Sequence, residues 1–568
     1  YSQFAGTVFR VKGGAANANA DPSMFGAIEH MGKVFPLVMG MLQDRDLPVR
    51  VQAAVTIKEL VEQECMPPSM LEHLPKLMEL LFSLLQEVGA DEIVSTVDTL
   101  IEHYGEQMVP YACQVVSALA ASFMRLVDES DEDDEDDATL AALGVMQALS
   151  SMMEAVAGKA EIYRTMEAPL MPLFMRCCQQ DAEDYFEEML ELLSYITYYA
   201  TDISPQLWEL VPRLHAVYFD WGRDYINNVS LALDNFISRS PEAFLTINNG
   251  SLVQMIMSIA RDALISEELN EGMMESDVHG APKLVESMLH SCRGRIDAIV
   301  PDLMACVLMR LDKAESRALK TLLYTALSSA VHYNPALALQ VLEHRQASTT
   351  VLTAWANHLS TTEKLRSHDL KMGVLAASSL LSVPNGQAPA MVAGNRLHLL
   401  RLGLTVLKRL DAVRQEKNAK AGEDDDDDDD DDDEDFSDFG DELDDDEEGG
   451  KELTTQEELA RLLRRAGGDS KKFNLSALTG DDDDDDDEDE LTDDEENYDT
   501  AIDKFDELVA FADAAQAASA EDADLLAKAG LNPRPEVPQV LGAEESAALR
   551  TALEAGVAKK HAPPAPPS

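Results

Sequence analysis

Positive charge, cysteine and aromatic residues are all scarce in this chain of 568 residues. It has 45 lysines and arginines against 106 aspartates and glutamates, 6 cysteines and 6% aromatic residues. The cysteines form no C-x-x-C pair, which favours reduced, buried thiols in a nucleocytoplasmic protein over a disulfide framework or a metal site. They are Cys65, Cys113, Cys177, Cys178, Cys292 and Cys306.

Long hydrophobic runs and a targeting signal are also missing. No apolar run approaches the roughly 20 residues that a membrane-spanning helix needs, so we expect no membrane insertion. The N-terminus lacks the basic start and the apolar stretch of a signal peptide. Because residue 1 is Tyr rather than Met, we expect the chain to be a piece of a longer polypeptide, with residues 1–23 as a poorly ordered or truncated segment.

What is abundant is acid, and three segments hold much of it. Residues 128–137 contain 9 acidic residues, residues 423–450 contain 21 and residues 481–496 contain 14, with no lysine or arginine in any of them. The rest of the chain has 62 carboxylates against 45 Lys and Arg, a net charge of −17. With 45% hydrophobic residues in the chain, this remainder is an ordinary, mildly acidic folded protein.

Between about residues 24 and 420, apolar residues recur at i, i+3, i+4 and i+7, which is typical of amphipathic helices. In five places an apolar residue followed by proline is predicted to open a helix, since proline suits the first helical position. These are Pro75, Pro110, Pro172, Pro212 and Pro301, spaced by 35, 62, 40 and 89 residues. An acidic segment lengthens the second step, and a helix starting near Ser251 divides the last. Helix pairs repeating every 40–47 residues predict an all-α HEAT-repeat superhelix (solenoid), with an irregular helical bundle as the alternative.

The stretch "DRDLPVRVQAAVTIKEL" has the features of the second helix of such a pair. Pro48 belongs in its first turn and Arg50 just beyond, while the small Ala53 and Ala54 would let helices of neighbouring repeats approach closely. The predicted structural signature of the repeats consists of these four residues with Pro110, Pro172, Pro212 and Pro301. The tryptophans and the tyrosines of residues 195–199 lie at helical spacing and are predicted to pack between repeats.

The composition changes after residue 420. Residues 421–497 form an acidic low-complexity region with a short predicted helix over 455–466, and this region and the acidic loop 128–137 are predicted to be disordered insertions. Residues 498–560 should form C-terminal helices, and 561–568 a disordered proline-rich tail. Residues 396–420 carry seven Lys and Arg beside the aspartates, and whether this basic helix binds the acidic region within the same chain is left open.

Three stretches carry a resemblance to a known family. Residues 183–237 ("EDYFEEMLELLSYITYYATDISPQLWELVPRLHAVYFDWGRDYINNVSLALDNFI"), "HYNPALALQVLE" and "SHDLKMGVLAASSLL" closely resemble the C-terminal half of the importin-seven/importin-eight branch of the importin-beta (karyopherin-beta) transport receptors. The order of features is similar too, from "LPVRVQAA" through the Ser-Pro-Gln-x-Trp region to long acidic runs and a last pair of helices.

The resemblance implies a nuclear import receptor that shuttles between nucleus and cytoplasm and carries basic cargo, such as ribosomal proteins and histones, in a Ran-GTP-dependent cycle. It implies Ran-GTP as a partner, mainly through N-terminal repeats outside this chain, together with Phe-Gly nucleoporins and importin-beta as a candidate co-receptor. No direct contact with nucleic acid is implied. The alternative is an acidic chaperone for histones or ribosomal proteins, or a HEAT scaffold, without a Ran cycle.

The acidic segments can be a surface for basic cargo or solvated spacers. Dense aspartates keep counterions that a polycation would release, which gives fast, salt-sensitive attraction. Phe436 and Phe439 would serve a docking segment as aromatic anchors, although their presence by chance explains them equally well. The candidate cargo contacts are Asp133, Asp424, Asp428, Asp433, Phe436, Phe439, Asp481 and Asp485.

Enzymatic chemistry has little support in the sequence. Residues 438–440 read D-F-G, but the Gly-rich loop, the lysine strand and the H-R-D motif of a kinase are missing. The histidines show no metal-ligand spacing, and no Ser/His/Asp or Cys/His arrangement emerges. We therefore predict no enzyme, no cofactor and no catalytic or metal-binding residue.

Overall fold

The computed structural model describes residues 33–62, 70–88, 91–129, 135–200, 202–266, 274–423 and 501–561. Regular structure in these ranges is helical, without a strand. The chain divides into two compact units, residues 1–314 and 315–568, which we call unit 1 and unit 2.

The described part of unit 1 starts with a helix over residues 33–41 and continues with a series of mostly long helices. These are α3 (Leu47–Glu62), α4 (Met70–Val88), α5 (Asp91–Met108), α6 (Ala112–Glu129), α7 (Glu135–Ala155), α8 (Ala160–Cys177), α9 (Phe186–Tyr199), α10 (Leu210–Asp220), α11 (Ile226–Arg239), α12 (Pro241–Thr246), α13 (Ser251–Ile265), α15 (Gly280–Ser291) and α16 (Val300–Leu311). Short stretches of 3₁₀ helix separate some of them, namely η1 (Val109–Tyr111), η2 (Gln180–Tyr185), η3 (Leu207–Glu209), η4 (Ile247–Gly250) and η5 (Ser276–Val278).

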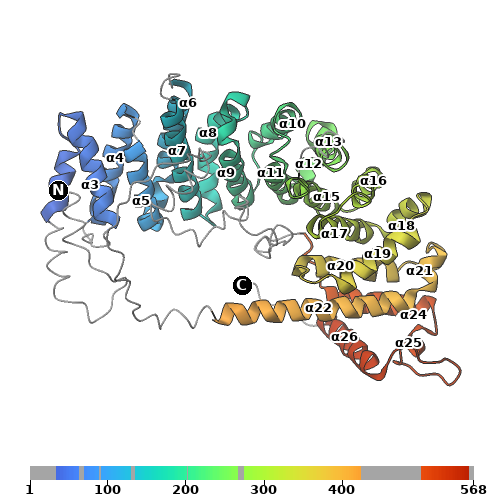
Figure 1. Ribbon diagram of the computed structural model, residues 1–568. Coiled ribbons are helices and arrows are strands. Elements are labelled where there is room, and N and C mark those ends of the chain that lie inside the picture. Colours follow the sequence, from blue (N-terminus) through green and yellow to red (C-terminus); the bar gives the residue numbers. More distant parts are fainter. Residues whose placement is uncertain are drawn as a thin grey trace, which may run out of the picture. The chain divides into compact units, whose positions relative to one another are not determined.

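The helices of unit 1 pack in two rows (Figure 1). One row, which we call row B, contains α3, α5, α7, α9, α11 and α15, each in contact with the next. The other row contains α4, α6, α8, α10 and α13, and each helix of row B from α5 onwards also packs on the helix that precedes it in this second row. This is the arrangement of a HEAT-repeat solenoid, in which each helix pair contacts its neighbours along the chain.

Side-chain hydrogen bonds between helices of neighbouring repeats indicate the length of the repeat in residues. Lys58 of α3 donates to Ser95 of α5, 37 residues further on. Tyr195 of α9 donates to Glu154 of α7 across 41 residues, and Asn235 of α11 donates to the Ser194 carbonyl across another 41. Contacts that recur at this separation arise because each helix meets its counterpart in the next repeat, which confirms the predicted period.

The positions predicted for close packing are buried. Pro48 lies in the first turn of α3, Ala53 and Ala54 are 3% and 0% exposed, and Thr96 of α5 donates a 3.3 Å hydrogen bond to the Ala54 carbonyl. Arg50 is half-buried and pairs with Glu87 of α4 at 2.7 Å.

Two of the predicted helix-opening prolines are placed differently. Pro301 opens α16, Pro110 lies in η1 just before α6, and Pro212 lies in the first turn of α10, but Pro75 and Pro172 lie inside α4 and α8. The prediction was wrong for these two. An interior proline costs a helix about 3 kcal/mol, and burial of the leucines on both sides offsets that cost: Leu74 and Leu77 around Pro75, Leu170 and Leu173 around Pro172.

The acidic loop predicted at 128–137 is shorter than expected. The structure continues α6 to Glu129 and begins α7 at Glu135, so both ends of the acidic stretch are helical. Acidic residues suit the first turn of α7 because they face the positive end of its dipole. The helix expected near Ser251 is confirmed as α13.

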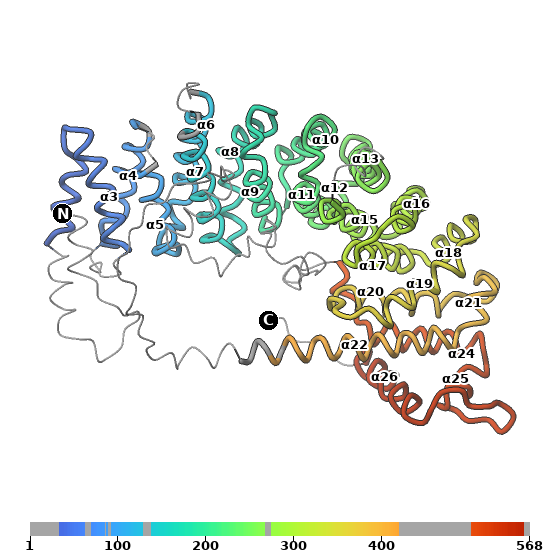
Figure 2. The backbone as a smooth tube through the Cα atoms, viewed as in Figure 1, coloured from blue at the N-terminus to red at the C-terminus, as the bar shows by residue number. Residues whose placement is uncertain are grey.

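Unit 2 contains α17 (Arg317–Tyr333), α18 (Pro335–His344), α19 (Ser348–Thr361), α20 (Ser367–Leu381), α21 (Ala390–Gly394), α22 (Arg396–Glu423), α24 (Glu507–Glu521), α25 (Leu525–Lys528) and α26 (Ala543–His561). In Figure 2 the C-terminal helices α24–α26 lie against α20 and α22. The chain thus leaves this packed layer at the end of α22 and rejoins it after residue 500. The division predicted from sequence, a solenoid over 24–420 and separate C-terminal helices over 498–560, stays a prediction.

Close packing holds α24 on its neighbours. Ile502 packs with Met372 and Leu375 of α20. Phe511 is fully buried beside Gly403 of α22, where an added Cβ would lie 2.5 Å from the ring. Glycine at 403 is therefore what lets the two helices approach this closely.

Two stretches, Glu92–Asp128 and Pro241–Ile265, are long and apolar enough to cross a membrane by length and composition, contrary to the expectation from sequence. Each is made of shorter helices. The turn η1 separates α5 from α6, and left-handed Asn248 and Asn249 interrupt the chain between α12 and α13. Their apolar side chains are core residues of the repeats, such as Leu119 and Ile259.

Candidate functional site

A strip of carboxylates crosses three consecutive helices of row B. Asp98 lies on α5, Glu154 on α7, and Glu188 and Glu191 on α9. Asp98, Glu188 and Glu191 are half-buried beside buried apolar residues of their helices, and Glu154 is exposed. We call these four residues the carboxylate strip.

Asp98 stands between α3 and α7. Burial raises the pKa of its carboxyl to about 6, and the negative charges of Glu102 and Glu154 act in the same direction. A hydrogen bond with Ser151 and the positive charge of Lys58 act in the opposite direction without overcoming the effect of burial. The environment of this group therefore disfavours its charge.

The two glutamates of α9 are in a similar position. Burial raises the pKa of Glu188 to about 7, with Glu187, Glu191 and Asp184 adding to the shift. Burial also raises the pKa of Glu191 to about 7, with Glu154 of α7 as the neighbouring charge. Half-buried carboxylates near like charges are a common mark of functional sites, because a fold gains no stability from keeping them.

Tyrosines frame the strip. Tyr195 is buried and its hydroxyl donates a 3.0 Å hydrogen bond to Glu154 Oε1, which fixes that carboxylate. The Tyr199 ring stacks on Tyr163 at 5.3 Å, and the Arg239 guanidinium lies 4.5 Å above the Tyr198 ring. Tyr195 packs between repeats as predicted, whereas Tyr198 and Tyr199 are only half-buried.

The strip also has acceptor atoms without a partner. Asp98 Oδ1 and Glu188 Oε2 are shielded from solvent and accept no hydrogen bond from any of the described residues. An unsatisfied carboxylate oxygen costs free energy, and a positively charged group nearby would lower that cost. Asp98, Glu188 and Glu191 combine like-charge neighbours with raised pKa values, and Asp98 and Glu188 each have an unpaired oxygen, so the strip is suited to a cation.

A further carboxylate of row B, Asp234, lies on α11. Burial raises the pKa of Asp234 and Glu286 adds to the shift, while a hydrogen bond with Ser287 and the charge of Arg239 oppose it. The positive charge of Arg239 acts on Asp234, whereas no basic group is among the charges that act on Glu188 and Glu191. A bound cation would therefore stabilise Asp234 less than these two glutamates.

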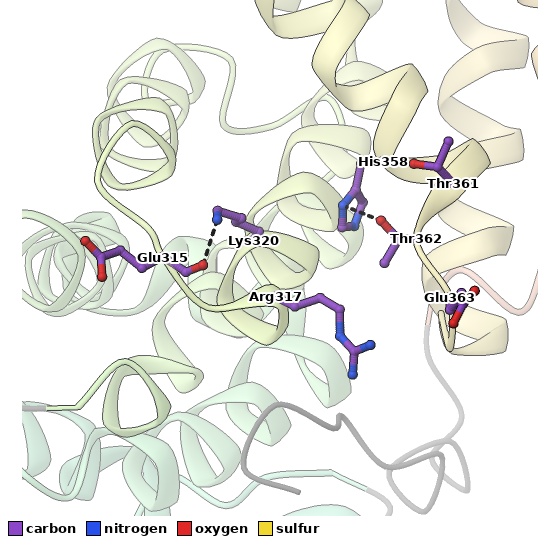
Figure 3. A pocket seen from close by; sticks show the side chains of 7 residues that line it. All are labelled: Glu315, Arg317, Lys320, His358, Thr361, Thr362 and Glu363. Carbon is purple, nitrogen blue, oxygen red and sulfur yellow. Dashed lines mark hydrogen bonds between the residues drawn. The ribbon is translucent and has the colours of Figure 1, made fainter. Parts of the chain in front are cut away.

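Unit 2 contains a separate cavity of about 500 Å³ (Figure 3). Its lining carries both signs of charge, and Lys320 donates to the Glu315 carbonyl at 2.7 Å. Burial lowers the pKa of His358 to about 4, so the imidazole is neutral near pH 7. Mixed charge favours no single ligand class. The lining residues are Glu315, Arg317, Lys320, His358, Thr361, Thr362 and Glu363.

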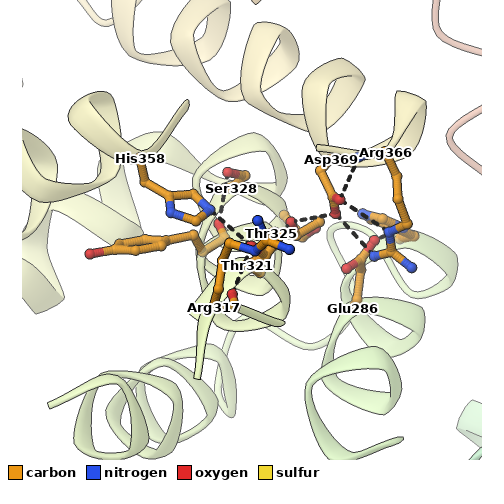
Figure 4. A network of polar contacts seen from close by, with 11 residues as sticks. Glu286, Arg317, Thr321, Thr325, Ser328, His358, Arg366 and Asp369 are labelled. Carbon is orange, nitrogen blue, oxygen red and sulfur yellow. Dashed lines mark hydrogen bonds and ion pairs between the residues drawn. The ribbon is translucent and has the colours of Figure 1, made fainter. Parts of the chain in front are cut away.

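Beside the cavity, polar contacts join the helices of unit 2 (Figure 4). Arg366 pairs with buried Asp369 at 3.0 Å, and Asp369 Oδ1 accepts a 2.9 Å hydrogen bond from Thr325 of α17. Burial alone would raise the pKa of Asp369, but the Arg366 guanidinium holds it below the usual range. This network ties α17 to α20 and has a structural role.

The basic helix α22 is largely engaged within unit 2. Arg396 is 2% exposed and donates to the Leu381 and Val383 carbonyls at the end of α20. Arg409 donates to carbonyls at the end of α19. Arg401 pairs with Glu545 of α26 and Arg414 with Glu507 of α24, both at 2.5 Å. Four of its seven cations thus hold the fold together, which leaves fewer for the acidic region.

The cysteines of the described ranges behave mostly as predicted. Cys177, Cys178, Cys292 and Cys306 are buried and form no disulfide, and burial raises the pKa of the Cys178 thiol to about 12. Cys113 differs because it is exposed. Cys65 lies outside the described residues.

The acidic cargo contacts predicted from sequence all lie outside the described residues, as does the helix predicted at 455–466. They are Asp133, Asp424, Asp428, Asp433, Phe436, Phe439, Asp481 and Asp485. The carboxylate strip was not predicted. Its members resemble the ordinary polar face of amphipathic helices, and the one available signal was the run of acids in "EDYFEEMLELL" next to apolar residues.

No family model matches the chain. Several proteins named as importins or importin-like are similar to it in sequence. The chain is 31% identical over 384 residues to an importin beta-like SAD2 homolog of Arabidopsis thaliana, covering 66% of this chain and 37% of that protein. It is 27% identical over 401 residues to a probable importin-7 homolog of Dictyostelium discoideum, covering 69% and 37%. Human importin-8 is 24% identical over 390 residues, covering 66% and 36%. The chain thus spans little more than a third of the length of these relatives.

Solved structures resemble the chain only loosely. A Kap95:Nup1 complex gives a TM-score of 0.41 at 11% identity, covering 94% of this chain and 53% of that one. Kap121p bound to Ste12p gives 0.35 at 14% identity, covering 71% and 39%. The sequence relatives and the helix pairs together define the class as HEAT-repeat karyopherins. The chain belongs to the importin-beta superfamily, in the branch of importin-7 and importin-8.

Proposed function

We propose that this chain is the cargo-holding part of a nuclear import receptor that shuttles between cytoplasm and nucleus and carries basic proteins, such as ribosomal proteins and histones. The observation that carries the proposal is the carboxylate strip on row B, in a chain whose relatives are importins. A row of carboxylates on packed helices would supply specificity, because it selects partners with cations in matching positions.

The acidic segments would contribute the rate of association. Residues 423–450 and 481–496 carry 35 carboxylates without a lysine or arginine. Such a polyanion attracts a polycation over long range and releases counterions when the two meet. Deleting both segments should slow association with a basic cargo such as histone H1 and flatten the dependence of its affinity on salt. If the dependence of affinity on salt is unchanged, the acidic segments are solvated spacers.

The transport cycle would add Ran-GTP, Phe-Gly nucleoporins and importin-beta as a co-receptor. The test is import in permeabilised cells by the natural protein, with a fluorescent basic cargo. We expect nuclear accumulation that requires Ran-GTP, and release of cargo from the purified complex when Ran-GTP is added. Absence of any Ran-GTP effect on cargo binding would contradict the receptor function.

The concentration of acid in a few segments favours a second candidate, a chaperone for histones or ribosomal proteins. In that case the acidic segments would provide most of the affinity and no GTPase would be involved. Deleting them would then abolish histone binding altogether, whereas a receptor that uses the carboxylate strip would keep measurable affinity at low salt. The two functions therefore differ in the residual affinity of the deletion variant.

A further inference from the structure

Asparagine is followed directly by glycine at two places in the chain, at Asn249–Gly250 and at Asn385–Gly386. Deamidation of an asparagine begins when the backbone nitrogen of the next residue attacks the side-chain carbonyl carbon, Cγ. Glycine hinders this attack least, because it has no Cβ. The two pairs share this chemistry, so a large difference in their reactivity has to come from the fold.

The first pair lies in the turn between α12 and α13. Asn248 and Asn249 are exposed and have left-handed backbone conformations, with φ of 51° and 57°, and Gly250 follows with φ of 77°. Closing a five-membered ring at Cγ requires rotation about the ψ bond of Asn249, which stands at 34°. A left-handed conformation costs free energy in residues other than glycine, so this rotation relieves strain. The Asn249 side chain forms no hydrogen bond with any of the described residues that would resist it.

The second pair is held by its surroundings, although it is exposed as well. Asn385 Nδ2 donates a 3.1 Å hydrogen bond to the Glu521 carbonyl at the end of α24, and Asn385 Oδ1 accepts a 3.0 Å hydrogen bond from buried Arg396. The Asn385 backbone N–H also donates to the Glu521 carboxylate at 3.1 Å. Attack on Cγ would have to break both side-chain hydrogen bonds, which means that the end of α24 would have to leave first.

We propose that Asn249 is a site of spontaneous deamidation, whereas docking of α24 protects Asn385. In the first step the Gly250 nitrogen loses its proton to hydroxide and bonds to Asn249 Cγ. The bond from Cγ to the amide nitrogen breaks, and ammonia leaves with a proton from water. In the second step water opens the cyclic imide: opening at Cγ gives aspartate, and opening at the main-chain carbonyl carbon gives isoaspartate. Water is thus the co-reactant, and no oxidant or reductant takes part.

Both products change the turn. Each places a negative charge there, and isoaspartate also lengthens the main chain by one carbon, because the chain then runs through the side chain. The helix α12 contacts α13, and α13 packs on α15 and α16, so the altered turn belongs to the packed repeats of unit 1. Deamidation would therefore divide the protein into new and aged populations that differ in charge and in the geometry of this repeat. This inference goes beyond the proposed function and does not depend on it.

The experiment incubates the whole chain at pH 6 and at pH 8, both folded and in guanidinium chloride. Trypsin then releases residues 240–261 and 372–396, which contain the two pairs, and mass spectrometry measures the modified fraction at each asparagine. Methyl transfer from labelled S-adenosylmethionine by an isoaspartyl methyltransferase measures isoaspartate. Asn249→Gln removes the reactive side chain, because its longer side chain would have to close a larger ring. Gly386→Ala is the matched control at the second pair, where an added Cβ meets no atom within 4 Å.

We expect Asn249 of the folded chain to deamidate at least about tenfold faster than Asn385, since a hydrogen bond to a charged group such as Arg396 contributes about that factor or more. Asn248 has the same exposure without a following glycine and should react far more slowly than Asn249. In guanidinium chloride the two Asn-Gly pairs should react at similar rates. The rate at Asn249 should rise from pH 6 to pH 8, because the attacking nitrogen must lose its proton. Asn249→Gln should remove most of the methyl transfer, and Gly386→Ala should leave the rate at Asn249 unchanged.

Equal rates at Asn249 and Asn385 in the folded chain would overturn the proposal. The same holds if Asn249 stays intact in the folded chain while it is modified in guanidinium chloride, because the turn would then protect its amide. Equal methyl transfer to Asn249→Gln and to the wild type would place the isoaspartate elsewhere in the chain and exclude this site.

Discussion

Replacing Glu191 by Gln should stabilise unit 1 while it weakens binding of a cationic partner. In the folded chain the pKa of this carboxyl is raised from its ordinary value of 4.5 to about 7, first by burial and then by Glu154. A tenfold change in proton affinity corresponds to about 1.4 kcal/mol. Keeping Glu191 ionised in the folded state therefore costs up to about 3 kcal/mol, which glutamine would remove in large part.

The pH dependence follows from the same two values. The unfolded carboxyl ionises near pH 4.5 and the folded one near pH 7, so the folded state binds the proton more tightly. The cost is absent below about pH 4.5, grows as the pH rises, and is complete above about pH 7. The stability gained by Glu191→Gln should be largest at pH 8 and small at pH 5.

Hydrogen exchange of the α9 amides, followed by mass spectrometry, is the suitable assay, because two compact units need not unfold in one step. Each variant is compared with the wild type at the same pH, and Glu161→Gln, which changes an exposed glutamate of α8, serves as the control. Equal protection of α9 in Glu191→Gln and in the control at pH 8 would contradict the assigned cost of burying Glu191. An equal gain in protection at pH 5 and pH 8 would contradict it as well.

Two predictions concern the packing of unit 2. Arg396→Met should destabilise unit 2 by about 2–4 kcal/mol because it leaves two carbonyls at the end of α20 unpaired. Hydrogen exchange of the α20 amides measures this, and a loss below about 0.5 kcal/mol would contradict the assigned cap. Gly403→Ala should cost about 1–3 kcal/mol through overpacking against Phe511. Phe511→Leu should cost less in the Gly403→Ala background than in the wild type, and additive effects would show that the two residues do not compete for space.

The repeat architecture could be predicted from the sequence because helical period and repeat length are local patterns that many residues report at once. Ala53 and Ala54 are buried as their size suggested. Pro75 and Pro172 led to wrong helix starts because a helix can continue through a proline when the turn before it is buried. Whether that turn is buried depends on packing against neighbouring repeats. Local sequence does not contain this information.

The candidate site could not be predicted for a related reason. Glu191 is an unremarkable glutamate on a helix until Glu154, 37 residues earlier in the chain, is placed beside it by the packing of α7 on α9. The shift in its pKa comes from burial, which one sequence does not reveal. The acidic segments, by contrast, are obvious from composition and yet lie outside the described residues.

The return of the chain to unit 2 after residue 500 has a consequence for how the protein withstands proteolysis. Non-covalent contacts join the C-terminal helices to α20 and α22, independently of the chain that connects them. These are the packing of Ile502 and Phe511 and the pairs of Arg401 with Glu545 and Arg414 with Glu507. A protease that cut between residues 424 and 500 would produce two fragments held as one particle, and the acidic residues would remain attached to it from both sides of the cut.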